Sequence, residues 1–334
     1  MLRLAINGYG RIGRCALRAL YESAHRNRMQ IVAINEPADL NTIAHLTKYD
    51  TTHGRFPGRV AIENDQLRIN DDIIAVSHSS NLTDLPWREF DIDVVLECSG
   101  EYGTVEQLQN HLRLGAKHVL LSQPGVNEIP AVVFGVNQTI IGESDTIVSA
   151  ASCTTNCVVP VIEILNDAFG IENGIITTIH SAMNDQPVLD AYHHTDLRKT
   201  RAAGQSIIPV DTGLATGLGR VLPHLDGRFA AHALRVPTIN VSAMQLAIRC
   251  NKPVTVDSVN RILAAAAANE FGTILGYTDE PLASSDFNHD PRSGIVDASQ
   301  TRVAGDLVNV LIWFDNEWGY ANRMLDVVAH WLQD

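Results

Sequence analysis

The sequence is short of positive charge. Its 25 lysines and arginines stand against 38 aspartates and glutamates, which gives a formal net charge of −13 at pH 7. Such a balance argues against a nucleic acid or an anionic membrane surface as the main partner. The sequence also lacks any apolar run near the roughly 20 residues that a membrane-spanning helix needs. We therefore expect a protein that neither crosses a membrane nor binds nucleic acid.

Cysteine is also scarce. The five cysteines, an odd number at scattered spacings, do not suggest a disulfide framework. No second cysteine pair with ligand spacing accompanies Cys153 and Cys157, so we expect no metal site. Reduced thiols are typical of a cytoplasmic protein. The first strand-like segment, 2–7, follows no charged region with a cleavage site, so we expect no secretory signal.

A glycine-rich turn follows this first strand. Gly8-Tyr9-Gly10-Arg11-Ile12-Gly13 precedes a helix predicted over 14–23, and a second strand, 30–35, ends at Glu36. Glycines at this spacing let the backbone approach a pyrophosphate at the helix N-terminus, and the acidic residue can bind a ribose hydroxyl. Glu36 would repel a 2′-phosphate, which favours NAD over NADP. A purely structural glycine turn is the alternative, and it leaves the strand, helix and acidic residue unexplained.

Further strand-like segments alternate with helical stretches. The runs 93–98 and 118–122 read as buried strands, the first followed by Ser99 and the second ending at Ser122. This alternation predicts an α/β fold with a Rossmann-type, doubly wound parallel sheet. Ligands bind such sheets at the carboxyl ends of the strands, where Glu36, Ser99 and Ser122 are expected.

The second half of the chain has a different residue pattern. A chain of 334 residues, 45% hydrophobic, is long enough for two domains. β-Branched runs at 175–179, 233–241 and 307–314, with a helix at 256–269, predict an α+β domain with a mainly antiparallel sheet covered on one face.

Two other segments of this half stand out. The long polar stretch Ser181–Gln205 predicts a functional or interface loop. The amphipathic segment 318–332 predicts a helix that packs back on the first domain.

Cys153 stands where a helix should begin. It lies between a strand-like segment, 146–151, and the apolar helical pattern of 158–165. A thiol at a helix N-terminus lies near unpaired N–H groups and the positive end of the dipole, and both stabilise a thiolate. The alternative is a pair of core cysteines, which is the simpler interpretation of Cys157.

Five motifs occur in order along the whole chain: Ala5–Arg14, Lys48-Tyr49-Asp50, Ala151–Cys157, Arg235-Val236-Pro237-Thr238 and Asp315–Tyr320. Together they resemble the glyceraldehyde-3-phosphate dehydrogenase family. The resemblance implies an NAD-binding domain at 1–151, joined by the C-terminal segment 316–334, and a catalytic domain at 152–315. It also implies a homotetramer, in which the 181–205 loop lies against a neighbouring subunit near its cofactor.

Within this family, several segments resemble the erythrose-4-phosphate dehydrogenase branch. They are Ile179–Gln186, Asp286–Ser293, Gln300–Val303, Ser122–Gly125 and Val210–Gly213. Met183 stands where the glyceraldehyde enzymes usually have a threonine that contributes to a phosphate site, and a thioether cannot donate a hydrogen bond to phosphate. Lys199 stands where an arginine is usual, so a point charge replaces a bidentate fork.

The resemblance assigns site residues by position. It implies that Cys153 is the nucleophile and that His180 is its base, the thiol ionising near neutral pH when paired with the imidazole. The cofactor-binding residues would be Gly8, Gly10, Arg11, Ile12, Gly13, Glu36, Ser99, Ser122 and Asn316, the last holding the nicotinamide carboxamide. The substrate-binding residues would be Ser152, Thr154, Lys199, Thr212, Gly213 and Arg235.

The expected reaction is an NAD-dependent oxidation of a small phosphorylated aldehyde through a thiohemiacetal and a thioester on Cys153. In the erythrose branch water resolves the thioester to give 4-phospho-D-erythronate, on the route to pyridoxal phosphate. One alternative is the phosphorylating glyceraldehyde-3-phosphate dehydrogenase of glycolysis, in which inorganic phosphate is the acceptor. A less favoured alternative is an NAD-binding protein without catalytic activity.

Overall fold

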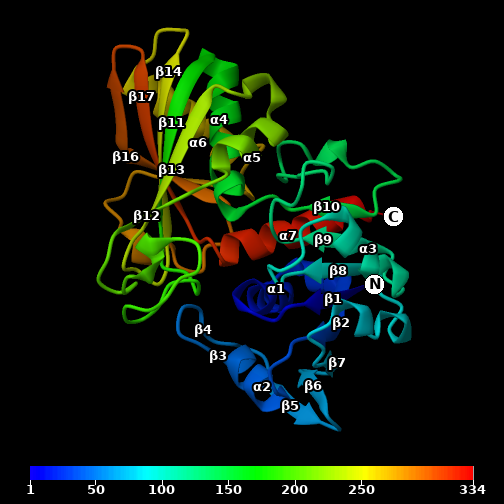
Figure 1. The fold of residues 1–334 in the computed structure, drawn as a ribbon. Helices are drawn as coiled ribbons and strands as arrows, with labels where there is room; N and C mark the ends of the chain where they lie inside the picture. Colours follow the sequence, from blue (N-terminus) through cyan, green and yellow to red (C-terminus); the bar gives the residue numbers. More distant parts are fainter. Residues whose placement is uncertain (334) are drawn as a thin grey trace. The chain divides into compact units, whose positions relative to one another are not determined.

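The computed structural model describes residues 1–333 and divides into two compact units. The first unit comprises Met1–Ser152 and the segment from Ala321 onward, and the second comprises Cys153–Tyr320. Each unit has its own large sheet, and Figure 1 labels the elements in chain order. Asp334, at the end of the expected C-terminal segment, lies outside the described residues.

The first unit contains an eight-stranded sheet. Its strands are β1 (Leu2–Asn7), β2 (Met29–Asn35), β5 (Val60–Glu63), β6 (Gln66–Ile69), β7 (Asp72–Ser77), β8 (Val94–Glu97), β9 (His118–Leu121) and β10 (Ile147–Ser149). Its helices are α1 (Arg11–Glu22), α2 (Leu40–Lys48), α3 (Val105–Arg113) and most of α7 (Trp318–Trp331). A separate small hairpin joins β3 (Tyr49–Asp50) and β4 (Gly54–Arg55).

The strand order of this sheet is β10-β9-β8-β1-β2-β7-β6-β5, and β10 through β7 pair in parallel. The parallel α/β sheet expected from the sequence is therefore confirmed, with an antiparallel extension through β6 and β5. The register places Asn35, Asn7 and Glu97 side by side at the carboxyl ends of β2, β1 and β8. Polar side chains from distant parts of the sequence therefore meet at the edge where ligands of such sheets bind.

The second unit contains a seven-stranded sheet of order β12-β13-β11-β14-β17-β16-β15. The strands are β11 (Ile171–His180), β12 (Ile208–Val210), β13 (Phe229–Arg235), β14 (Ser242–Cys250), β15 (Leu275–Thr278), β16 (Gly294–Ala304) and β17 (Leu307–Phe314). The helices are α4 (Cys153–Phe169), α5 (Leu214–Val221) and α6 (Val256–Ala268). Four of its six neighbouring strand pairs are antiparallel, so the expected mainly antiparallel sheet is confirmed.

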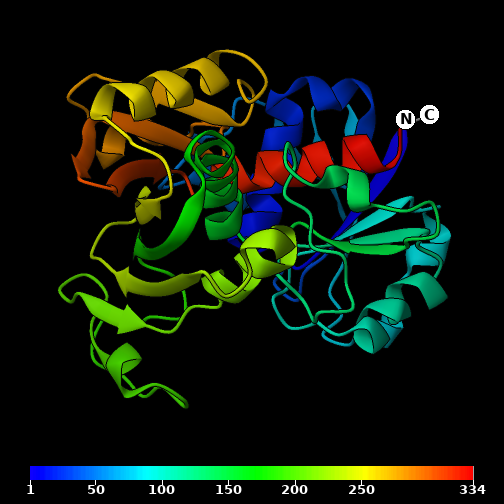
Figure 2. The same cartoon turned by 90° about the horizontal axis from the view of Figure 1, so that it is seen from above.

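The helices α4 and α6 contact each other and this sheet, and Figure 2 shows the same elements from above. The strand predicted over 233–241 ends earlier, at Arg235, because the chain turns at Val236 and Pro237 cannot donate to a strand ladder. A separate strand, β14, begins at Ser242. Within residues 1–333, no helix is both long and apolar enough to cross a bilayer.

Candidate active site

A pocket opens at the carboxyl edge of the first unit's sheet. Its lining includes Gly8 and Gly10 from the glycine-rich turn, Glu36 at the end of β2, and Ser99 after β8. These four residues come from three neighbouring strands, so the structure brings together the parts that the sequence placed far apart. The described lining of this pocket does not include Ser122.

Two glycines of the turn are required by close packing. Gly8 has φ +85°, and a Cβ there would overlap the backbone of Ser99. A Cβ at Gly13 would overlap the carbonyl oxygen of Gly8, so α1 approaches the end of β1 more closely than any side chain permits. At Gly10, in contrast, a Cβ would have no neighbouring atom within 4 Å, and the residue directly precedes the first turn of α1. This arrangement fits a dinucleotide, because an anionic group can reach the N–H groups of Arg11 and Ile12 at the helix start.

Glu36 is held in place by backbone donors. Its Oε2 accepts a hydrogen bond from the N–H of Tyr9 at 2.8 Å, and its Oε1 accepts one from Ala38 at 3.3 Å. Each carboxylate oxygen keeps a free lone pair, so Glu36 can still accept from ribose hydroxyls. The carboxylate thereby also ties the glycine-rich turn to the end of β2.

Arg11 is engaged by an acidic partner. Its guanidinium forms a two-point ion pair with Asp50, whose carboxylate also accepts from the N–H groups of Thr52 and His53. Burial alone would raise the pKa of Asp50, but these donors bring it down to about 2. The side chain of Arg11 therefore fixes the β3–β4 hairpin.

Ser99 and Ser122 lie on a buried polar network. The Glu97 carboxylate accepts from the N–H and hydroxyl of Ser99, at 2.8 and 2.5 Å, and from Asn7 Nδ2 at 2.7 Å. Trp87 donates to Nδ1 of His111 at 2.8 Å, so His111 donates through Nε2 to Glu97 at 2.9 Å. The backbone N–H of Ser122 donates to the carbonyl oxygen of Glu97 at 3.0 Å. Both serines are thus tied to Glu97 at the carboxyl edge of the sheet.

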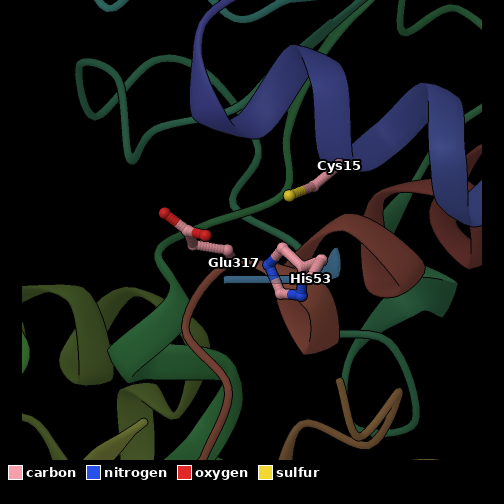
Figure 3. Close-up of side chains that lie close together, drawn as sticks. All are labelled: Cys15, His53 and Glu317. Carbon is pink, nitrogen blue, oxygen red and sulfur yellow. The ribbon is translucent and has the colours of Figure 1, made fainter. Parts of the chain in front are cut away.

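A further pair of side chains in the first unit is shown in Figure 3. Cys15 comes from α1 and His53 from the turn between β3 and β4, and their sulfur and ring nitrogen lie within 4.8 Å of each other. Glu317, drawn in the same picture, belongs to the second unit. Protein metal sites usually take three or four protein ligands, so this pair does not by itself make one.

In the second unit, Cys153 is the first residue of α4, as its position in the sequence predicted. Ala151, two residues earlier, has φ +56°, a conformation that alanine rarely adopts. The Sγ atom of Cys153 lies 3.9 Å from Nε2 of His180, the last residue of β11. These two side chains, separated by 26 residues of sequence, are thus in hydrogen-bonding contact. Cys157 is fully buried one turn later and is a core residue.

Burial dominates the electrostatics of this pair. It raises the pKa of the Cys153 thiol to about 11, although the charge of Arg235 and the N–H groups of Thr154 and Cys153 act in the opposite direction. Burial, followed by the charge of Arg235, lowers the pKa of His180 to about 4. Both shifts favour the neutral forms of the two side chains, whereas the sequence led us to expect a thiolate.

Arg235 lies against His180. The two residues end the parallel strands β13 and β11 and are direct register partners. Arg235 Nη1 is 2.7 Å from His180 Nδ1, and the Ser181 carbonyl oxygen is 2.8 Å from the same nitrogen. Arg235 Nε is buried and has no hydrogen-bond partner within residues 1–333, so the guanidinium retains donor capacity for a ligand.

The other expected substrate-binding residues lie in separate parts of the chain. Lys199 forms a 2.8 Å ion pair with Asp185, so its charge is already partnered. Thr212 and Gly213 precede α5, with the Thr212 hydroxyl accepting from the N–H of Leu214. Helix α5 contacts α4, which begins with Cys153 and Thr154, and Ser152 precedes α4 in the chain.

Asn316 belongs to the second unit and has a defined orientation. Its Oδ1 accepts hydrogen bonds from the hydroxyls of Ser181 and Ser242, at 2.9 and 2.8 Å. Both serines are fully buried. The amide nitrogen is therefore the group that Asn316 can offer to a ligand, as a partner of a carboxamide oxygen requires.

Sequence reasoning missed several of these residues. Asp185 and Ser181 stand inside a segment that the sequence did mark, so their polar side chains were a usable signal. Ser242 and His111 carried no local signal, because each acts through a partner more than 10 residues away.

Two family models match the chain. The model for the glyceraldehyde 3-phosphate dehydrogenase NAD-binding domain matches residues 2–105, and that for the C-terminal domain of the same enzyme matches residues 152–316. The first match contains the glycine-rich turn and Glu36, and the second contains Cys153, His180 and Arg235. The chain therefore belongs to the glyceraldehyde 3-phosphate dehydrogenase family, a family of NAD-dependent oxidoreductases that act on small phosphorylated aldehydes.

Proposed function

We propose that this chain oxidises D-erythrose 4-phosphate to 4-phospho-D-erythronate, a reaction on the route to pyridoxal phosphate. The observation that carries the proposal is Met183, whose side chain is 44% exposed at the position where a phosphate-binding threonine is usual. Its backbone N–H donates to Gln186 rather than to a ligand. A site without this donor holds a phosphate group differently, which favours a substrate of different length.

The proposed chemistry follows from the second unit. The sulfur of Cys153 attacks the aldehyde carbon, and His180 takes the hydroxyl proton of the resulting thiohemiacetal as the carbonyl re-forms. Bound NAD supplies the acceptor for the hydride that leaves the same carbon. The thioester left on Cys153 is then attacked by water, the carbon–sulfur bond breaks, and the acid departs as the thiol is restored.

Phosphate recognition in this proposal centres on Arg235. Its guanidinium suits a two-point contact with a phosphate, and it adjoins the base. Ser152, Thr154, Thr212 and Gly213 would add hydroxyl and N–H donors, and Lys199 an additional charge held by Asp185. In the first unit, Gly8–Gly13 and Glu36 would hold the pyrophosphate and ribose of NAD, and Asn316 its carboxamide. In this proposal the NAD-binding domain comprises residues 1–151 and 316–334, and the catalytic domain comprises residues 152–315.

The test is NADH formation from erythrose 4-phosphate and from glyceraldehyde 3-phosphate, each with and without inorganic phosphate. We expect faster turnover of the four-carbon aldehyde, independent of added phosphate. A strict phosphate requirement with preference for the triose would contradict the proposal and identify the glycolytic reaction instead.

The matched control is Cys153→Ala, which should abolish turnover of both aldehydes while NAD still binds. Because the side chain of Cys153 is not part of the described pocket around Gly8 and Glu36, NAD titration of this variant checks that the loss is chemical.

A further inference from the structure

A buried carboxylate lies one layer behind the pocket of the first unit. Glu97, at the end of β8, is 1% exposed, and each of its oxygens accepts two hydrogen bonds. Oε1 accepts from the N–H and hydroxyl of Ser99, and Oε2 accepts from Asn7 Nδ2 and His111 Nε2. Ser99 and Asn7 belong to the described lining of the pocket. Glu97 and His111 do not, so a side chain outside this lining holds two residues that belong to it.

The direction of the bonds on the Asn7 side is fixed by the backbone of Ser79. Its N–H can only donate and bonds to Asn35 Oδ1 at 3.0 Å, and its carbonyl can only accept and bonds to Asn35 Nδ2 at 3.0 Å. Asn35 Nδ2 also donates to Asn7 Oδ1 at 2.9 Å, which leaves Asn7 Nδ2 to donate to Glu97. Since β7, β2, β1 and β8 are neighbours in the sheet, these amides join the loop after β7 to the end of β8.

The direction of the bonds on the other side is fixed by Trp87. Its indole N–H can only donate, so the Nδ1 atom of His111 is bare and the ring proton lies on Nε2, toward Glu97. The side chains of Trp87 and His111 are both fully buried. The imidazole therefore has one orientation and one tautomer, and it presents a donor to the carboxylate.

Only donors meet at Glu97, and an ionised carboxylate is the form that can accept from all of them. A buried charge of this kind is stable when its hydrogen bonds are complete. Loss of one donor leaves an oxygen unsatisfied or turns the carboxylate away from Ser99 or Asn7. The backbone of Ser99 packs so closely on Gly8 that a Cβ at Gly8 would come within 2.4 Å of it. A shift of Ser99 is therefore transmitted to the glycine-rich turn.

We propose that Glu97 and His111 are positioning residues for NAD, which hold the pocket in its binding geometry without touching the cofactor. Glu97 gathers Ser99 and Asn7, and His111 supplies the donor that keeps the carboxylate in place. A pocket that is already ordered avoids the cost of ordering it on binding. The inference rests on the proposed placement of NAD in the pocket that Glu36 lines, and it is independent of which aldehyde is the substrate.

The first experiment measures the affinity for NAD by calorimetric titration of the full chain at pH 7, for His111→Leu and His111→Gln. Leucine cannot donate, whereas the glutamine amide can accept from Trp87 and donate to Glu97. We expect His111→Leu to bind NAD about tenfold more weakly, and His111→Gln to stay within about twofold of the unmodified chain. Equal affinity in all three proteins, or equal weakening in the two variants, would overturn the inference.

Ile92→Ala is the control for lost packing. Ile92 is fully buried in the same hydrophobic cluster as Trp87, and it belongs neither to the hydrogen-bond network nor to the described lining of the pocket. Urea denaturation should show a lower free energy of unfolding for this variant, while NAD affinity stays within about twofold of the unmodified chain. Weakening of NAD binding in proportion to lost stability, in Ile92→Ala as in His111→Leu, would mean that the network serves folding alone.

Glu97→Gln keeps the shape of the side chain but turns one end into an amide donor that faces other donors. We expect about tenfold weaker NAD binding, and this variant carries the test if His111→Leu does not fold. When both changes are combined, NAD affinity should fall by much less than the product of the two single effects, because both act through one carboxylate. Effects that multiply would show that Glu97 and His111 act separately and would overturn the inference.

Glu36→Ala tests the placement of NAD itself, because Glu36 lines the pocket and its carboxylate bonds to Tyr9 and Ala38 rather than to Glu97. Weaker NAD binding in Glu36→Ala, with normal binding in His111→Leu, would keep the pocket and reject the positioning role. Normal binding in Glu36→Ala would place NAD elsewhere, and the inference would fall with the proposed placement. Turnover of erythrose 4-phosphate, measured separately, tests the aldehyde whatever these affinities are.

Discussion

At the scale of single residues, the Cys153 thiol and the His180 imidazole lie in contact in the second unit. Burial favours the neutral form of each side chain, and the guanidinium of Arg235 lies against the imidazole. Lys199 and Asp185 form an ion pair at 2.8 Å, so the charge of Lys199 is already partnered.

The buried imidazole should make stability depend on pH. The pKa of His180 is lowered in the folded state to about 4, so its contribution is present above the unfolded value of about 6.5 and is lost as pH falls toward 4. We expect the free energy of unfolding to fall by about 2 kcal/mol between pH 7 and pH 4.5 through this residue. Urea denaturation of the unmodified chain and of His180→Asn at both pH values measures it. An equal pH dependence in the two proteins would remove His180 as its source.

At the scale of elements, Gly10 and Gly13 belong to one glycine-rich motif but meet different structural requirements. Gly13 is needed for the packing of α1 against the end of β1, and Gly10 leaves open space at the start of the helix. The first requirement concerns folding, and the second concerns the approach of a ligand.

Alanine at each position should therefore have different effects. Gly13→Ala should lower the free energy of unfolding by about 2 kcal/mol, since a backbone clash forces the helix to move. Gly10→Ala, at φ −73°, should leave stability nearly unchanged but weaken NAD binding about tenfold, because the methyl group fills the approach to the helix N–H groups. Thermal unfolding and NAD titration of both variants give the comparison. Equal losses of stability would show that the two glycines share one role.

Local patterns predicted the elements that carry their own signal. The strand, glycine turn and acidic residue of the first unit are adjacent in sequence, and Cys153 stands visibly between a strand and a helix. The contact between Arg235 and His180 could not be predicted in this way, because it depends on β13 lying beside β11 in parallel register. Strand order is decided by packing among distant segments, which local periodicity does not encode. The strand β14 was missed for a related reason, since Pro237 and the following turn obscured where the new strand begins.

At the scale of the whole molecule, the 183–207 region presents apolar side chains on the surface of the second unit. Val188, Leu189, Tyr192 and Leu197 are 87%, 77%, 103% and 84% exposed. Large exposed apolar residues that cluster in one segment mark an interaction surface. The homotetramer that the sequence resemblance implies, in which this loop would lie against another copy of the chain, stays a prediction.

Charge on this loop should weaken the assembly. We expect the double variant Leu189→Asp, Tyr192→Asp to sediment as a smaller species than the unmodified chain at the same concentration, because burying two carboxylates in an interface is costly. Ile140→Asp, at another exposed apolar position in the first unit, is the control and should not change the sedimentation. An unchanged mass in the double variant would place the interface elsewhere.

The helix α7 sets the order in which the two units can be completed during synthesis. Asp326 of this helix pairs with His25 at 2.7 Å, and the rings of Trp331 and His118 lie 4.9 Å apart, so the last segment of the chain completes the unit that contains the first. The second unit is one continuous segment and has all its strands before α7 emerges from the ribosome. The dinucleotide unit, although translated first, is therefore finished last, because its final helical segment leaves the ribosome only after every strand of the second unit.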